Sequence, residues 1–179
     1  MNLRGNRVTL KTIIVFETHY GSTKQAASRI AKILKEDFSH EVFLYNLSKN
    51  QKHPDISSFD NVIVGSCIYN GSWVPHIENF LANSFDEKKI ALFVCSMFAG
   101  EKSLYKHAYR TYLENLLEKY PHIKPISMEA FGGRVPKYNY PDEWVTQVAN
   151  KLPSFTTDNK DLAKIDDWGR KLGNLLKQD

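Results

Sequence analysis

The sequence of 179 residues is poor in cysteine: it contains only Cys67 and Cys95, and no C-x-x-C motif. Two cysteines cannot supply a disulfide framework, so the composition favours a reduced, cytoplasmic setting. No run approaches the roughly 18 apolar residues that a membrane-spanning helix needs, so we expect peripheral membrane contact at most. The segment 1–11 is polar and basic and lacks the apolar stretch of a secretory signal.

The sequence also lacks a strong excess of charge of one sign. Its 24 Lys and Arg against 20 Asp and Glu give a net charge of +4, and the basic residues are interleaved with acidic ones. This distribution predicts a solvated surface and no nucleic-acid partner. With 42% hydrophobic and 12% aromatic residues, the chain can bury a real core, and its length predicts a single domain over residues 1–179.

Several motifs of catalytic and metal sites are missing. The six histidines have no metal-ligand spacing, so we expect no metal site, and no Gly-x-Ser-x-Gly elbow of an α/β-hydrolase is present. Walker A and G-x-G-x-x-G motifs are absent as well. A receiver domain would need an acidic pair after the first strand, where Glu17 stands alone. We expect Cys67 and Cys95 to be packed residues and not nucleophiles.

What the sequence does contain is a regular alternation of short apolar runs and amphipathic stretches. The runs predict strands at 11–17, 41–46, 61–67, 89–96 and 124–131. The amphipathic stretches predict helices at 24–38, 74–81, 102–120 and 161–176, with Ser72 as a possible cap of the second. This order predicts an α/β fold with a parallel sheet covered by helices on both faces.

The strongest local signal lies between the first strand and the first helix, where residues 18–23 read Thr-His-Tyr-Gly-Ser-Thr. Free N–H groups and the helix dipole favour an anion at a helix N-terminus. Gly21 allows the backbone to turn close to a phosphate. The alternative interpretation is an ordinary hydroxyl-rich helix cap.

Two further loops follow the third and fourth predicted strands, and in an open parallel sheet they lie at the same edge as residues 18–23. The loop 67–73 brings flat aromatic rings, and the loop 95–100 is small and apolar. Together the three loops suit a flat, phosphorylated aromatic ligand. Ordinary packing at a domain edge is the alternative for the aromatic residues.

The loop Thr-His-Tyr-Gly-Ser-Thr resembles the T-x-x-G-x-T phosphate loop of the flavodoxin superfamily. More closely, the chain resembles the menaquinone-dependent protoporphyrinogen dehydrogenases of bacteria, which are flavodoxin-like FMN proteins. The similar stretches include Phe-Asp-Asn-Val-Ile-Val-Gly-Ser-Cys-Ile-Tyr-Asn-Gly, Phe-Gly-Gly-Arg-Val-Pro-Lys-Tyr and Ile-Asp-Asp-Trp. The resemblance implies a flavodoxin-like three-layer sandwich whose five-stranded parallel sheet has the order 2-1-3-4-5.

The resemblance also implies a non-covalent FMN and a set of residues around it. Its phosphate would lie on Thr18, His19, Tyr20, Gly21, Ser22 and Thr23. The isoalloxazine would be lined by Ser66, Cys67, Ile68, Tyr69, Asn70 and Gly71. The other wall would be Ser96, Met97, Phe98, Ala99 and Gly100. The implied activity is electron transfer from a porphyrinogen-type substrate through FMN to a quinone or another acceptor; the alternative is a flavodoxin-like electron carrier that binds redox protein partners.

An insertion at 132–160 separates the fifth predicted strand from the last helix. Loops of this length on a compact domain are often functional. Because it leaves the sheet at the edge where the flavin is expected, we predict that it forms a wall of a substrate or partner site. Arg134 and Lys137 are candidates to meet substrate propionates as charge-assisted pairs. A surface flap with a short helix at 142–152 is the alternative.

Overall fold

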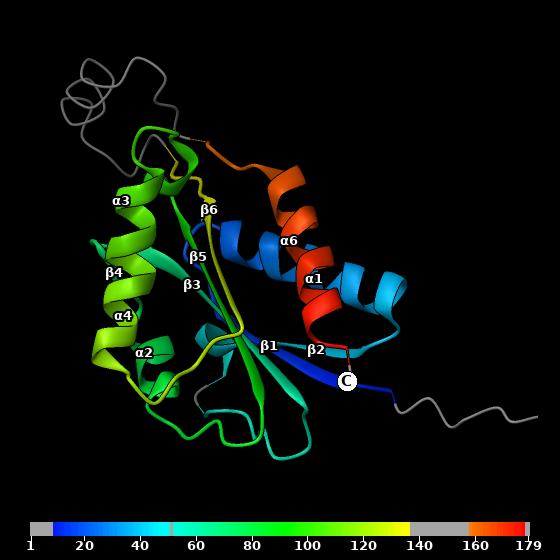
Figure 1. Ribbon diagram of the computed structural model, residues 1–179. Helices are drawn as coiled ribbons and strands as arrows, with labels where there is room; N and C mark the ends of the chain where they lie inside the picture. The colour runs from blue at the N-terminus through cyan, green and yellow to red at the C-terminus, as the bar shows by residue number, and fades with distance from the viewer. Residues whose placement is uncertain (1–8, 51, 137–157, 178–179) are drawn as a thin grey trace, which may run out of the picture.

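The computed structural model describes residues 9–50, 52–136 and 158–177 (Figure 1). Its sheet consists of β1 (Lys11–Glu17), β2 (Glu41–Asn46), β3 (Asn61–Tyr69), β4 (Ser72–Trp73), β5 (Lys89–Ser96) and β6 (Ser127–Gly132). The five longer strands are parallel and lie in the order β2-β1-β3-β5-β6. This confirms the predicted order 2-1-3-4-5 of five parallel strands. The short β4, which pairs antiparallel with β3, was not predicted.

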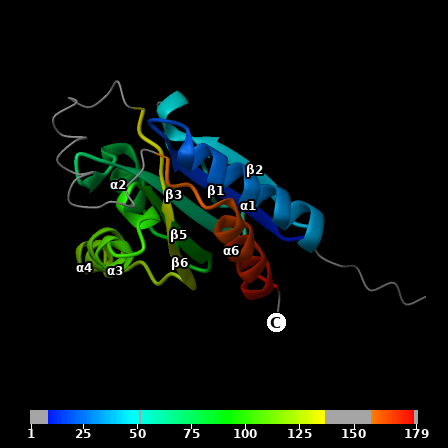
Figure 2. The same ribbon diagram turned by 90° about the horizontal axis from the view of Figure 1, so that it is seen from above.

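Helices cover both faces of the sheet and complete a three-layer sandwich (Figure 2). One face carries α1 (Ser22–Phe38) and α6 (Leu162–Leu175). The other face carries α2 (Pro75–Leu81), α3 (Tyr105–Tyr109) and α4 (Asn115–Lys119). A π-helical turn, Arg110–Glu114, joins α3 to α4.

The strand sequences explain these layers. Ile13 and Val15 of β1 pack on the side of α2, whereas Ile14 and Phe16 pack on the side of α1. Successive side chains of a strand point to opposite faces, so a strand buried on both faces must be apolar at every position. The continuous apolar runs of the sequence are therefore the central strands.

Several predicted boundaries were wrong. The helix expected from residue 102 begins at Tyr105, because the preceding turn is held by Glu101, whose carboxylate accepts from the Ser103 backbone and hydroxyl. Ser72 does not cap α2, because it lies in β4 and Val74 precedes the helix. The expected strand 124–131 begins three residues later, at Ser127. The predicted helix 142–152 lies outside the described residues.

Within the described part of the chain, no helix has the length and apolar character needed to cross a membrane.

Candidate cofactor site

The loops that follow β1 and β5 and the end of β3 meet the residues that follow β6 around an open cavity, whose empty space is about 330 Å³ when the solvent at its mouth is included. The cavity is lined by Thr18, His19, Tyr20, Ser22, Thr23, Cys67, Ile68, Cys95, Ser96, Met97, Gly133, Arg134 and Val135. It lies beyond the carboxyl ends of the strands. There the chain changes from winding over the α1 face to winding over the α2 face, which is where ligands bind in open α/β sheets.

The loop between β1 and α1 is shaped for an anion. Gly21 has a φ of +89°, in the left-handed region, and its α-carbon faces open space. Its carbonyl accepts the first helical bond from the Gln25 N–H, and its own N–H donates to Thr18 Oγ1 at 3.0 Å. In the described chain the backbone N–H groups of Ser22, Thr23 and Lys24 have no acceptor. These groups and the helix dipole attract a negatively charged ligand.

Three hydroxyl groups of this loop keep their protons available. Thr18 Oγ1 accepts from Gly21, and Ser22 Oγ accepts the Arg134 backbone N–H at 2.9 Å. Thr23 is fully buried, and its Oγ1 forms no hydrogen bond of normal geometry in the described chain. A phosphate accepts hydrogen bonds only, so hydroxyls that can still donate fit the phosphate of FMN. The unpaired Thr23 oxygen is the clearest sign that a ligand belongs here, because buried polar groups are otherwise almost always paired.

Two buried thiols lie beneath the loop. Cys67 and Cys95 are register partners on β3 and β5. Burial raises the pKa of Cys67 to about 11 and that of Cys95 to about 12, although the nearby Thr23 hydroxyl opposes the rise at Cys95. Both are therefore protonated near neutral pH, as expected of packed residues and not of nucleophiles.

The loop after β3 is a tight hairpin that carries an aromatic wall. Asn70 and Gly71 have φ values of 49° and 78°, as a two-residue turn between β3 and β4 requires. The Tyr69 ring, 44% exposed, lies 4.4 Å from the His19 ring, centroid to centroid. Trp73 is instead buried and donates its indole N–H to the Tyr112 carbonyl, so it anchors the hairpin and does not face the cavity.

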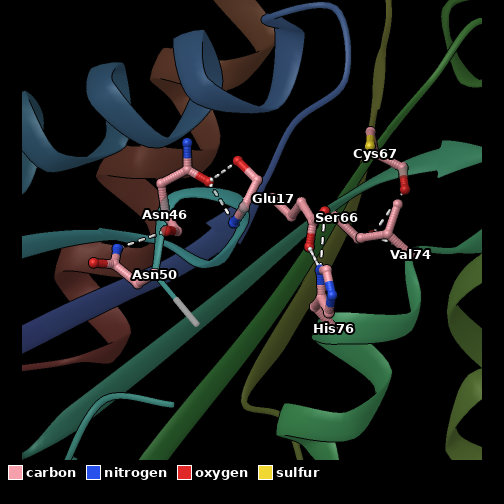
Figure 3. A network of polar contacts seen from close by, with 8 residues as sticks. Glu17, Asn46, Asn50, Ser66, Cys67, Val74 and His76 are labelled. Carbon is pink, nitrogen blue, oxygen red and sulfur yellow. Dashed lines mark hydrogen bonds and ion pairs between the residues drawn. The ribbon is translucent and has the colours of Figure 1, made fainter. Parts of the chain in front are cut away.

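Two polar side chains near the site, Glu17 and Ser66, do not line the cavity and meet other partners (Figure 3). Glu17 lies on the α2 side of β1 and pairs with His76, with Oε2 3.1 Å from Nδ1. Ser66, predicted to line the isoalloxazine, does not line the cavity: its hydroxyl accepts from the Val74 N–H and donates to the Cys67 carbonyl. Glu17 therefore adds no carboxylate to the phosphate loop, and Ser66 braces the hairpin.

Both ends of the insertion are fastened at the cavity. The Gly133 N–H donates to the Ser96 carbonyl, and the Asn159 N–H donates to the Gly133 carbonyl, both at 3.0 Å. Arg134 forms an isolated antiparallel bridge with Asp158. A β-carbon on Gly132 would lie 1.6 Å from the Asn159 carbonyl oxygen, so this crossing needs glycine.

Sequence reasoning missed Gly133, Val135 and Asn159, although the Gly-Gly pair could have indicated a close backbone approach. Of the predicted residues, Tyr69, Asn70 and Gly71 form the hairpin next to the cavity, and Phe98, Ala99 and Gly100 form a 3₁₀ turn after β5. Lys137 lies outside the described residues. The roles of all these residues as ligands stay predictions.

Comparisons with known proteins agree with this geometry. A family model of the flavodoxin domain matches residues 13–161. Over 174 residues the chain is 23% identical to protoporphyrinogen IX dehydrogenase [quinone] of Escherichia coli (strain K12), covering 94% of each chain. It superposes on a flavodoxin from the domain Archaea with a TM-score of 0.60 and 15% identity, covering 94% of this chain and 100% of that one. A flavoprotein in complex with FMN from Lactobacillus acidophilus NCFM gives a TM-score of 0.50 and 17% identity over 68% of this chain and 93% of that one. The chain belongs to the flavodoxin domain family, and the family model together with the structural neighbours supports FMN as its cofactor.

Proposed function

We propose that this protein is an FMN-dependent oxidoreductase that oxidises a porphyrinogen-type substrate and passes the electrons to a quinone or another acceptor. The observation that carries the proposal is the similarity to the E. coli dehydrogenase, which extends over 94% of both chains and so includes the region of the insertion. The net charge of +4 supports it, because a porphyrinogen carries carboxylates that a basic protein attracts.

In this proposal, the cofactor and the parts of the cavity have separate roles. FMN, when bound, would supply the redox chemistry, taking two electrons each time the substrate loses two hydrogens, so that three such rounds with re-oxidation by the acceptor would give the porphyrin. The loop 18–23 holds the phosphate with hydroxyl and backbone donors. Cys67 and Ile68 at the end of β3 form one side of the cavity, residues 95–97 at the end of β5 form another, and Gly133 to Val135 form a third. These walls orient the ligand and exclude water from it.

The test is an anaerobic assay of the FMN-loaded protein with protoporphyrinogen and a menaquinone analogue. Formation of the aromatic porphyrin is followed by its fluorescence. We expect turnover that depends on both FMN and the quinone, with the same protein stripped of FMN as the control. Because porphyrinogens also oxidise spontaneously in air, oxygen must be absent.

The alternative is an electron carrier without a small-molecule substrate, and the same protein decides between the two. A preparation that binds FMN stoichiometrically, leaves protoporphyrinogen unchanged, and shuttles electrons between a flavodoxin reductase and an acceptor protein would contradict the proposed enzyme activity. It would leave the cofactor assignment in place.

A further inference from the structure

We propose that Arg134 binds the phosphate of FMN with its guanidinium group, and that the first residues of the insertion are therefore part of the cofactor site. From the sequence alone, Arg134 was a candidate to pair with the propionates of a substrate. The proposal rests on the cofactor and not on the substrate, so failure of the porphyrinogen assay would not affect it.

The first argument is position. Arg134 lines the same cavity as Thr18, Ser22 and Thr23. Its backbone N–H donates to Ser22 Oγ at 2.9 Å, which fixes its α-carbon beside the first residue of α1. The bridge to Asp158 holds the backbone from the other side. The long side chain of an arginine held here reaches an anion at the helix N-terminus.

The second argument is charge. Among the described residues that line the cavity, Arg134 is the one whose side chain is permanently cationic. Its guanidinium has no hydrogen bond or ion pair in the described chain, and the carboxylate of its bridge partner Asp158 is paired with Lys160 at 3.3 Å. A guanidinium matches the oxygens of a phosphate with two parallel hydrogen bonds.

The third argument is the state of the hydroxyl groups. Because Ser22 Oγ already accepts the Arg134 N–H, its own proton is left to donate to the ligand. The buried Thr23 Oγ1 has no hydrogen-bond partner of normal geometry among the described residues, and Thr23 lines the same cavity. An acceptor-only dianion at this point would satisfy both hydroxyls and the guanidinium together.

The experiment titrates the apoprotein with FMN and with riboflavin, which has the same ring and ribityl chain but no phosphate. Arg134→Gln should weaken FMN binding by at least about tenfold, the loss expected for a charge-assisted hydrogen bond, and leave riboflavin binding within about twofold. Lys35→Gln is the matched control. It removes an exposed cation from the last turn of α1, away from the cavity, and it should change neither affinity by more than about twofold.

An unchanged FMN affinity in Arg134→Gln would overturn the proposal, and so would an equal loss for FMN and riboflavin, because either result makes Arg134 structural. Should the glutamine variant fail to fold, Arg134→Lys decides the question, since it keeps the positive charge and loses the two parallel hydrogen bonds of the guanidinium. Its ratio of FMN to riboflavin affinity should fall by about threefold or more, and an unchanged ratio overturns the proposal.

Discussion

Thr12 and Thr23 are both completely buried, yet their hydroxyl groups differ in an informative way. Thr12 Oγ1 lies 2.9 Å from His40 Nδ1 and accepts from Asn61 Nδ2 at 3.1 Å, at the amino end of the sheet. Thr23 Oγ1, at the carboxyl end, has no partner in the described chain. An unpaired buried hydroxyl costs about 1–3 kcal/mol. This cost arises at Thr23, at the ligand site, and not at Thr12, whose hydroxyl is paired.

Replacing each threonine by valine should therefore have opposite effects. In the apoprotein, Thr23→Val should leave the free energy of unfolding unchanged or raise it by up to about 1 kcal/mol, because it removes an unpaired polar group. It should also weaken FMN binding at least tenfold. Thr12→Val should lower the free energy of unfolding by about 1–3 kcal/mol and leave FMN binding unchanged. Urea unfolding of the apoproteins and FMN titrations measure both quantities, and equal destabilisation by the two variants would contradict this interpretation.

The residues of the phosphate loop could be recognised from the sequence, because their order along the chain is itself the signal. The contacts that complete the loop could not. Ser22 meets Arg134 across 112 positions, and no local pattern of residues predicts that approach. Nor does the sequence predict that Thr23 Oγ1 lacks a hydrogen-bond partner in the described chain, because this depends on how the neighbouring segments pack.

At the scale of elements, the contact between α1 and α6 depends on two glycines one helical turn apart. A β-carbon on Gly173 would lie 2.3 Å from the Phe38 ring, and one on Gly169 would lie 3.0 Å from the Ile33 side chain. Glycine weakens a helix by about 1 kcal/mol relative to alanine, so its presence here reflects the close approach of the two helices.

Gly173→Ala should for this reason destabilise the protein, although alanine is the better helix former. We expect a net loss of about 1 kcal/mol or more in the free energy of unfolding, because overpacking costs about 1–3 kcal/mol. Removing the ring by Phe38→Ala should abolish this penalty, so that adding Gly173→Ala to that background is neutral or stabilising. A double-mutant cycle in urea measures the coupling, and additive effects would show that the two residues do not interfere.

How well an element could be predicted depends on what defines it. The limits of β1 and β5 match the apolar runs because burial alone defines a central strand. The prediction of one helix over residues 102–120, after β5, was only partly correct. Its start depends on a turn held by the Glu101 side chain, and its π-helical turn, Arg110–Glu114, has no sequence signature.

At the scale of the whole molecule, stability should depend on pH through His40. Burial lowers the pKa of this histidine below its ordinary value of about 6.5, against the opposing charge of Asp60. The folded state thus resists protonation more than the unfolded state does. The contribution of His40 to stability is complete above about pH 6.5 and is lost as the pH falls below that value, with a slope of at most about 1.4 kcal/mol per pH unit.

His40→Gln removes the titrating group and should flatten this part of the dependence below about pH 6.5. The exposed His107→Gln serves as the control and should follow the wild type. Free energies of unfolding at several pH values test the prediction, and parallel curves for wild type and His40→Gln would refute it.

The insertion can be shortened without disturbing its fastened ends. Because Arg134 and Asp158 are paired, a Gly/Ser linker of about four residues can replace residues 137–157. FMN binding should survive, since Gly133 to Val135 and Asn159 remain in place. Turnover with the physiological electron partner should collapse if the segment forms a substrate wall. A folded variant with full turnover would show that residues 137–157 do not contribute to turnover.

The bond between Ser22 and Arg134 also has a consequence for the amount of protein in a cell. The cavity exists only when the first and the last thirds of the chain are assembled, so a ligand there binds the native state and not the unfolded one. Such a ligand at 100 times its dissociation constant adds about 2.7 kcal/mol to the free energy of unfolding. We therefore expect the supply of flavin to raise the folded fraction of this protein and to slow its proteolysis, so that its abundance rises with its cofactor.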